Sequence, residues 1–537
     1  SLNGIILDFN HTTNFIQGNF IGTDVTGTQA VGNGQHGISM TGSNSFTTGN
    51  NAINGNVISA NGGAAVYIHA MDDQSENSNM VQSNFVGTDI TGSNALGNSG
   101  GGIVIDHAHN TVIGGTGSSA GNVIAHNGSA GGHPGVSVLA GTSNLILGNS
   151  IFANGCLGID LDNDGVTVND PGDSDTGANN LQNFPVITAV NASGGMTTVS
   201  GRLNSSPNTM YRIEVFANDT IDATGYGEGQ SLIGAGDFTT DASGNVSFSV
   251  SNPFTQIGAE QRVTATATDP NNNTSEFSGA IGQLLNVSTR MKVLTGNSVL
   301  IGGFIVGGSG SKDVLLRALG PTLTQFGVIG ALGDPTLDLR DSNQNQIAFN
   351  DNWKDTQQAA ISATGKAPPN DPEAAIRHTF TPGNYTAIVR GKNNTTGVSL
   401  FDAYDLDGSN TATLTNISTR GFVDTGQNVM IGGFISGNGI VRVIVRALGP
   451  TLTQFGVPNV LADPTLELRD GNGTLIASND NWQDSQQAEI QASGKAPPNA
   501  SEAAIIVVRP AANTTAVVRG KNNTTGNALV DAYILPP

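Results

Sequence analysis

The chain has 537 residues, of which 73 are glycine, 12% are charged and 5% are aromatic, and its formal net charge is −21. It is too long for one ordinary domain and too rich in glycine for a helical protein, so we expect several β-domains in series. No stretch reaches the roughly 18 to 20 consecutive apolar residues that a membrane-spanning helix needs. We therefore expect no membrane span.

Charge is distributed unevenly along the chain. Residues 1–201 contain 12 Asp and one Glu but no Lys or Arg, and the first basic residue is Arg202. A surface with this excess of carboxylates repels phosphate groups, which argues against nucleic acid and anionic lipid as partners. Cations are the partners that this part of the chain favours.

Cys156 is the only cysteine, so an intrachain disulfide and a cysteine-rich metal site are both excluded. We expect it to fill space at a corner of the fold. Enrichment in Asn, Thr, Ser and Gly with few Lys is typical of secreted bacterial proteins, which predicts an extracellular or cell-surface location. The chain starts at a serine without a charged or apolar leader, so we expect any export signal to have been removed or not included.

The first third of the chain repeats itself. The segment Gly-Asn-Phe-Ile-Gly-Thr-Asp-Val-Thr-Gly at 18–27 returns as Ser-Asn-Phe-Val-Gly-Thr-Asp-Ile-Thr-Gly at 83–92. Within this repeat a shorter Asn-x-Ile/Val unit recurs at alternating long and short intervals, at Asn19, Asn56, Asn84, Asn122 and Asn149. Short strands recurring in this way predict a parallel β-solenoid with aliphatic residues stacked inside. At a recurring corner, Asn can adopt the left-handed conformation and hydrogen-bond its neighbours in adjacent coils.

These coils carry a family resemblance. The Gly-Asn-x-Ile units, the Gly-Thr-Asp-x-Thr-Gly loops and the closing Gly-Ile-Asp-Leu-Asp-Asn-Asp-Gly segment that starts at Gly158 resemble the right-handed β-helix of large secreted bacterial repeat proteins. The resemblance covers residues 10–190 and implies a β-helix domain at 1–183. It implies no activity, because that fold hosts lyases, hydrolases, adhesins and structural proteins.

The remainder of the chain predicts three further β-domains. Residues 184–283 hold about seven short alternating strands and resemble the immunoglobulin-like sandwich that often follows such β-helices. Residues 284–408 and 409–537 are a tandem duplication, in which Asn350-Asp-Asn-Trp returns as Asn479-Asp-Asn-Trp. Both copies are similar to jelly-roll-like accessory modules of secreted bacterial proteins. The expected fold is all-β: a right-handed parallel β-helix, an Ig-like β-sandwich and two tandem sandwich or jelly-roll-like modules.

The sharpest local signal is Asp160-x-Asp162-x-Asp164-Gly165, which has the spacing of the first half of a calcium loop. The second half differs from an EF-hand, because Pro171 stands where the closing glutamate would be. Six aspartates are crowded into this segment: Asp160, Asp162, Asp164, Asp170, Asp173 and Asp175. We predict a structural calcium bound by Asp160, Asp162, Asp164 and Asp170. The alternative is a solvated acidic loop.

A second cluster emerges when the coils are aligned. His69 and Asp106 fall at the same position, just after the strands of adjacent coils and about 4.8 Å apart along the ladder. Nearby are Asp72, Asp73, Glu76, His107 and His109. Carboxylates paired with histidines suit glycoside hydrolysis, which makes Asp72, Asp73, Asp106 and His69 the catalytic candidates, and the same set suits a transition metal. The alternative is a polar turn that faces water.

Other features of the sequence favour structural roles. A polysaccharide lyase on a β-helix usually needs a basic residue, and residues 1–201 have none. We expect Trp353 and Trp482 to lie in module cores, with a sugar platform as the alternative. We expect the repeated arginines to pair with acidic residues of their own modules: Arg317, Arg446, Arg390 and Arg519.

We therefore expect a secreted, non-enzymatic structural or cell-surface protein that self-assembles into a filament or serves as an adhesive subunit. The first coil shows no capping helix, and an uncovered parallel edge invites pairing with another chain. This predicts head-to-tail contact or strand addition between copies, unless earlier coils of a longer chain supply the cap. The alternatives are a glycan-active enzyme of the glycoside hydrolase type and a glycan-binding adhesin.

Overall fold

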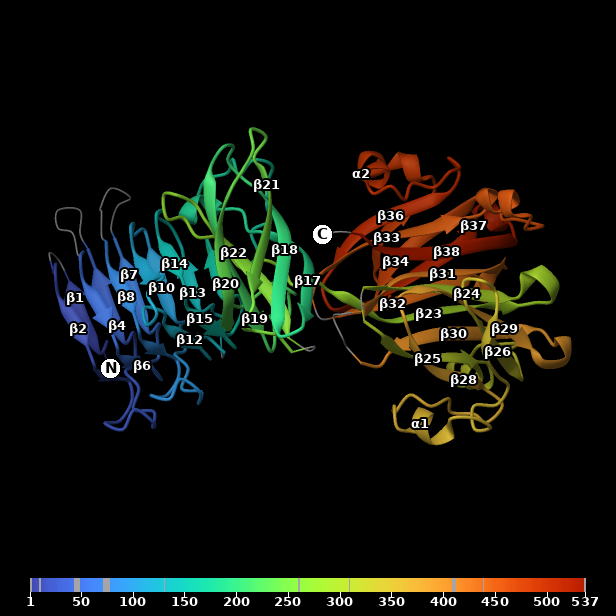
Figure 1. The fold of residues 1–537 in the computed structure, drawn as a ribbon, viewed down its shortest axis with the longest axis horizontal. Coiled ribbons are helices and arrows are strands. Elements are labelled where there is room, and N and C mark those ends of the chain that lie inside the picture. Colours follow the sequence, from blue (N-terminus) through green and yellow to red (C-terminus); the bar gives the residue numbers. More distant parts are fainter. Residues whose placement is uncertain are drawn as a thin grey trace. The chain divides into compact units, whose positions relative to one another are not determined.

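The computed structural model describes the whole chain apart from residues 1, 9–10, 43–48, 71–77, 130, 259–260, 309, 408–411, 438 and 536–537. The chain divides into two compact units, Ser1–Ile281 and Gly282–Pro537. Both are built from β-strands (Figure 1). Of the described helices, none has the length and apolar character needed to cross a membrane.

The first unit begins with a solenoid of three stacked parallel sheets. The first sheet contains, in order, β1 (Ile5–Asp8), β4 (Ile38–Thr41), β7 (Val66–His69), β10 (Ile103–Asp106), β13 (Val136–Val138) and β16 (Ile159–Leu161). The second contains β2 (Phe15–Gln17), β5 (Ala52–Asn54), β8 (Met80–Gln82), β11 (Val112–Gly114) and β14 (Leu145–Leu147). The third contains β3 (Phe20–Ile21), β6 (Val57–Ile58), β9 (Phe85–Val86), β12 (Val123–Ala125) and β15 (Ser150–Phe152). The all-β fold with stacked parallel sheets is therefore as predicted.

Aliphatic side chains in register fill the solenoid interior. Ile38, Val66, Ile103 and Val136 occupy one column of the first sheet, and all four are fully buried. Ile58, Val86 and Ile124 form the matching column of the third sheet. Because each coil adds one residue to each column, the apolar core runs without interruption from coil to coil.

Asparagine ladders run along three corners of the solenoid. Along one corner, each asparagine donates its backbone N–H and its side-chain amide to the Oδ1 of the asparagine in the next coil, in the order Asn19, Asn56, Asn84, Asn122 and Asn149. A second ladder contains Asn33, Asn61, Asn98, Asn127 and Asn154. A third includes Asn14, Asn51 and Asn79. These bonds satisfy polar groups that the corners bury.

The ladder confirms the predicted hydrogen bonding between coils but corrects the predicted backbone. At four of the five asparagines of the first ladder, the left-handed residue is the one before the asparagine: Gly18, Gly55, Ser83 and Gly148 have φ between 58° and 69°. Glycine relieves the strain of this turn, which leaves the following asparagine free to point along the stack.

A β-sandwich follows the solenoid in the same unit. One antiparallel sheet contains β17 (Val186–Ser193), β18 (Met196–Asn204) and β21 (Asn245–Asn252), and the other contains β20 (Ser231–Thr239), β19 (Met210–Asn218) and β22 (Arg262–Thr268). Two of its rings, Phe216 and Phe277, join the solenoid core. Ile151 of the last coil also pairs with Gly229 in an antiparallel bridge. The sandwich thus covers the C-terminal end of the solenoid.

The second unit contains the two repeated segments in one 16-stranded sheet. The first copy supplies β23 (Gln283–Val293), β24 (Leu300–Gly308), β25 (Lys312–Leu319), β26 (Pro335–Arg340), β27 (Gln346–Asn350), β28 (Ala374–Phe380), β29 (Gly383–Gly391) and β30 (Gly397–Asp405). The second supplies β31 (Ala412–Val423), β32 (Met430–Gly437), β33 (Val441–Leu448), β34 (Pro464–Asp470), β35 (Leu475–Asn479), β36 (Ala503–Arg509), β37 (Ala512–Gly520) and β38 (Gly526–Leu535). Short helices α1 (Gln358–Ser362) and α2 (Gln487–Ala492) lie at equivalent places in the two copies.

The two copies are joined edge to edge by reciprocal strand pairs. β24 pairs with β31, with Phe304 opposite Ile417, and β23 pairs with β32, with Val287 opposite Phe434. In the duplicated sequence Phe304 corresponds to Phe434 and Val287 to Ile417, so an internal two-fold relation links the copies. One apolar core extends across both.

Candidate functional site

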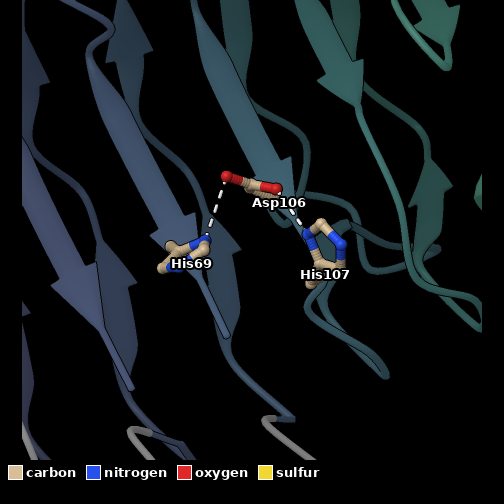
Figure 2. Close-up of side chains that lie close together, drawn as sticks. All are labelled: His69, Asp106 and His107. Atoms are coloured by element: carbon tan, nitrogen blue, oxygen red, sulfur yellow. Dashed lines mark hydrogen bonds and ion pairs between the residues drawn. The ribbon is translucent and has the colours of Figure 1, made fainter. Parts of the chain in front are cut away.

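The most distinctive polar cluster of the solenoid lies where β7 and β10 end. His69 and Asp106 are the last residues of these strands and face each other in the parallel register. His107 follows Asp106 with φ 58°, and this left-handed turn accompanies the return of its ring to the same carboxylate. Figure 2 shows the two imidazoles on either side of Asp106.

Asp106 accepts hydrogen bonds at both of its oxygens. His69 Nδ1 lies 3.0 Å from Oδ2, His107 Nδ1 lies 2.7 Å from Oδ1, and the Tyr67 hydroxyl donates to Oδ2 at 2.7 Å. Burial on its own would raise the pKa of Asp106, but the hydrogen bonds from Tyr67 and His107 and the charges of the two histidines lower it overall. The carboxylate is therefore ionised at neutral pH.

An aromatic stack supports this cluster. The Tyr67 ring stacks on His36, with centroids 4.8 Å apart, and on His69, with centroids 6.0 Å apart. Burial, together with the hydrogen bond to Asp106, raises the pKa of Tyr67, so its hydroxyl stays a donor. His36 Nδ1 accepts the backbone N–H of Ala64 at 3.0 Å. Sequence reasoning missed His36, although its position just before the strand of the neighbouring coil carries the signal.

Two of the four catalytic candidates predicted from the sequence lie together in the structure. It brings Asp106 and His69 together, whereas Asp72 and Asp73 lie outside the described residues. Acid–base glycoside hydrolysis usually uses two carboxyl groups, and Asp106 supplies one. The glycan-active alternative therefore stays a prediction.

Of the four predicted calcium ligands, Asp170 lies in a cluster of three carboxylates. Asp170 forms a group with Asp173 and Asp175, whose carboxylate oxygens lie within 4.8 Å of one another. Within the described ranges, no such group of three includes Asp160, Asp162 or Asp164. Asp162 accepts a backbone N–H instead, that of Ala178.

Several of these aspartates hold part of the closing loop. Burial raises the pKa of Asp160 to about 6, although the backbone N–H groups of residues 163–165 favour its ionised form. Asp162 accepts the N–H of Ala178 at 3.1 Å. Asp173 binds Gln182, the N–H of Asn183 and the Ser205 hydroxyl, and burial raises its pKa to about 6 as well.

Three buried glutamates of the sandwich bind the last solenoid coil. Glu214 accepts the N–H of Gly148 at 2.8 Å, and Glu228 accepts that of Asn154 at 3.2 Å. Glu276 accepts the N–H groups of Leu161 and Thr167, both at 3.0 Å. These glutamates accept hydrogen bonds from backbone N–H groups that would otherwise donate to the next coil of a longer solenoid. Burial raises the pKa of Glu228 and of Glu276 to about 8.

In the second unit, the residues singled out from the sequence are structural. Trp353 and Trp482 are each 6% exposed and pack in equivalent small cores. Arg317 donates two hydrogen bonds, of 2.9 and 2.7 Å, to the carboxylate of the buried Asp402. Arg446 binds Asp531 in the same bidentate way. Arg390 and Arg519 lie near Asp338 and Glu467 of their own copies. These observations confirm the core and ion-pair interpretations.

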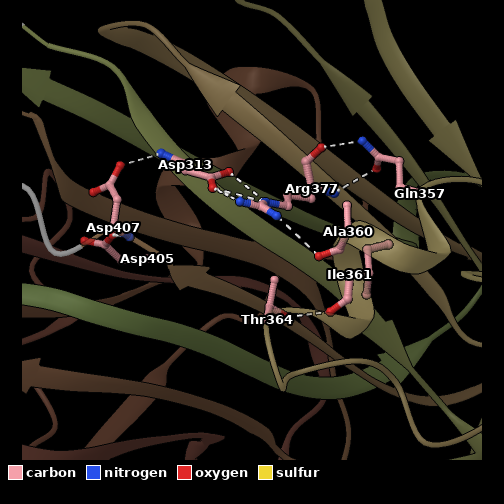
Figure 3. A network of polar contacts seen from close by, with 8 residues as sticks. All are labelled: Asp313, Gln357, Ala360, Ile361, Thr364, Arg377, Asp405 and Asp407. Atoms are coloured by element: carbon pink, nitrogen blue, oxygen red, sulfur yellow. Dashed lines mark hydrogen bonds and ion pairs between the residues drawn. The ribbon is translucent and has the colours of Figure 1, made fainter.

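The first copy also carries a polar network around α1. Arg377 binds the Asp313 carboxylate and the Ala360 carbonyl, and Gln357 binds the backbone of Arg377 at both its N–H and its carbonyl (Figure 3). Asp407 accepts the N–H of Asp313 at 2.9 Å. The network fixes the helix to β25 and β28, which makes its role structural.

Comparisons with known proteins give no family for the chain. No family model matches it. Among solved structures, the pre-peptidase C-terminal domain of a Bacillus anthracis collagenase is 15% identical over 22% of this chain and 89% of its own, with a TM-score of 0.15. Tailspike protein 2 of an Escherichia coli O157:H7 bacteriophage is 11% identical over 52% of this chain and 49% of its own, with a TM-score of 0.18. A tandem-repeat region of a large adhesion protein is 10% identical over 64% and 72%, with a TM-score of 0.12. The chain spans about half the length of the tailspike, and at these TM-scores none of the similarities carries a functional argument.

Proposed function

We propose that this chain is a secreted, non-enzymatic subunit of an extracellular surface or filament. In this proposal the solenoid is a right-handed β-helix, the following sandwich is Ig-like, and the two repeated segments are jelly-roll-like accessory modules. The observation that carries the proposal is the joint between solenoid and sandwich. Glu214, Glu228 and Glu276 bind the last coil while Phe216 and Phe277 extend its core. A solenoid joined to the next domain by a shared core and buried hydrogen bonds suits a rigid structural subunit.

The proposal includes self-association, and the joint between solenoid and sandwich limits which end of the solenoid can pair with a partner. Because the sandwich covers the last coil, end-to-end stacking of two solenoids is blocked on that side. A partner strand would pair with the first coil, where β1, β2 and β3 are edge strands. Large apolar side chains are exposed there: Leu2 is 75%, Ile6 45% and Phe15 79% exposed. The partner is a second copy or earlier coils of a longer chain.

A structural calcium is also part of the proposal, with Asp170, Asp173 and Asp175 as its ligands. Their side-chain oxygens gather closely enough for one ion. Oxygen donors of this kind are those that Ca²⁺ prefers. Bound calcium would tie the closing loop to the sandwich, since Asp173 already binds Ser205.

Electron microscopy and light scattering of the concentrated chain, with calcium and with a chelator, test this function. Ordered filaments or oligomers support it, and their loss in chelator supports the calcium. An Ile6→Lys variant, which places a charge on the exposed edge strand, should reduce assembly, whereas Val168→Lys, an exposed apolar position away from that edge, should not. A chain that stays monomeric at high concentration under all conditions refutes self-assembly.

A further inference from the structure

The cluster at the ends of β7 and β10 has the donors of a transition-metal site. His69, Asp106 and His107 each offer one atom, and these atoms lie within 4.8 Å of one another. It is the one group of three containing histidine in the described part of the chain. We propose that these three side chains bind one divalent first-row transition-metal ion, with Zn²⁺ as the reference ion. The proposal is independent of the surface role proposed above.

The observed distances are close to those of a filled site. Zn²⁺ binds imidazole nitrogen and carboxylate oxygen at about 2.0–2.2 Å, which puts neighbouring ligands of a tetrahedral ion about 3.3 Å apart. His69 Nδ1 lies 3.0 Å from Asp106 Oδ2 and His107 Nδ1 lies 2.7 Å from Oδ1, and the three ligand atoms lie within 4.8 Å of one another. Small rotations of the side chains therefore make room for the ion. An Nδ1 atom that binds the ion carries no proton, so the N–H of each bound ring stands at Nε2.

The site is held in place by the fold. The parallel ladder sets His69 opposite Asp106, and the left-handed turn at His107 accompanies the approach of the second ring from the far side (Figure 2). The Tyr67 hydroxyl binds Asp106 Oδ2 and fixes the rotation of the carboxylate. Hydrogen bonds of this kind to ligating groups typically strengthen metal binding about 10- to 100-fold. Tyr67 is thus a positioning residue.

An ion can reach these ligands without competition from a basic side chain of the solenoid. The side chains of His69, Asp106 and His107 are 25%, 17% and 46% exposed. Residues 1–201 contain no Lys or Arg, so no ammonium or guanidinium group of the solenoid neutralises Asp106. Two nitrogens and one carboxylate favour Zn²⁺, Ni²⁺ or Cu²⁺ over Ca²⁺ and Mg²⁺, which prefer oxygen ligands only.

Isothermal titration of the full, tag-free chain with ZnCl₂ tests the proposal, with CaCl₂ titrated in parallel. We expect one Zn²⁺ per chain at this site and a dissociation constant raised at least tenfold in Asp106→Asn and in His107→Asn. Asparagine tolerates the left-handed backbone of His107, so the second variant keeps the turn. Tyr67→Phe should weaken binding about tenfold while leaving the stoichiometry at one.

His133→Asn is the matched control, because His133 is an exposed histidine of the same solenoid outside the cluster. It should bind Zn²⁺ as the unaltered chain does. Circular dichroism and thermal unfolding establish that each variant is folded. The proposal is wrong if the unaltered chain binds no stoichiometric Zn²⁺, or if folded Asp106→Asn and His107→Asn bind it as tightly as the unaltered chain.

Discussion

The carboxylate of Glu276 accepts the backbone N–H of Leu161, 115 residues earlier in the chain, at 3.0 Å. Its other oxygen accepts the N–H of Thr167 at the same distance. A side chain of the sandwich thereby closes the edge that the last strand of the solenoid would leave open. Glu276 is thus a buried ionisable group that accepts two backbone hydrogen bonds at the joint between the solenoid and the sandwich.

The joint should make the stability of the first unit depend on pH. In the unfolded chain a glutamate ionises near pH 4.5, whereas in the folded chain burial raises the pKa of Glu228 and Glu276 to about 8. Between these values the folded state binds more protons, so the free energy of unfolding falls as pH rises from about 4.5 to about 8. The total loss is of the order of a few kcal/mol per site.

Calorimetric melts at pH 5, 7 and 9 measure this dependence. Glu228→Gln and Glu276→Gln remove the ionisable group and keep an acceptor for the backbone, so the slope should flatten in both. Glu489→Gln, at the ion pair with Arg442 in the second unit, serves as the control and should leave the slope unchanged. Equal slopes in all four proteins would contradict the role assigned to the buried glutamates.

The asparagine ladder predicts an effect that depends on position. Asn84 is buried and both accepts from Asn56 and donates to Asn122, whereas Asn19 is exposed and no described coil donates to it. Asn84→Ala leaves several buried groups unpaired and should cost about 3 kcal/mol or more, since each unsatisfied group costs about 1–3 kcal/mol. Asn19→Ala should cost less than half as much. Urea denaturation of the two variants makes the comparison, and similar losses would argue against the ladder.

One copy of the C-terminal repeat has a buried ion pair where the other copy has two apolar residues. Lys312 is fully buried and lies 2.6 Å from Asp405, which is 1% exposed, and it also meets Asp407 (Figure 3 shows both aspartates). At the equivalent positions the second copy has Val441 and Ile534. The apolar pair is thus compatible with the same strand geometry.

We expect the double variant Lys312→Val with Asp405→Ile to be as stable as the unaltered chain or more stable. Either single change leaves a buried charge without this partner and should cost about 3–5 kcal/mol. Denaturation followed by tryptophan fluorescence, arranged as a double-mutant cycle, measures the coupling. Additive losses in the double variant would show that the pair is not coupled.

Substitutions at two glycines distinguish the cost of backbone strain from the cost of a steric clash. Gly18 has φ 69° and open space where a Cβ would lie, whereas at Gly22, with φ 85°, a Cβ would lie 2.0 Å from the Ser59 carbonyl oxygen. Gly18→Ala should therefore cost about 1–2 kcal/mol, the penalty of a left-handed alanine. Gly22→Ala should cost several times more, because two coils must move apart. Thermal unfolding that ranks the two variants equally would contradict the close approach.

Much of the fold follows from the sequence because the solenoid is periodic. Aligning the recurring strands puts His69 opposite Asp106, and alternating apolar residues identify the columns of the core. The duplication likewise indicates two equivalent modules, with Trp353 and Trp482 at matching places. In each case neighbouring residues and recurring intervals carry the information.

Tertiary structure decided the features that no interval encodes. Glu276 and Leu161 come from segments with different periods, so their contact depends on how the sandwich docks on the last coil. The left-handed turn at His107 accompanies the return of its ring to Asp106, and the grouping of Asp170 with Asp173 and Asp175 depends on how the closing loop folds. The pairing of Phe304 with Ile417 depends on edges that meet only after both copies have folded. Sequence patterns report local burial and repetition, whereas these contacts arise from long-range packing and from the need to satisfy buried polar groups.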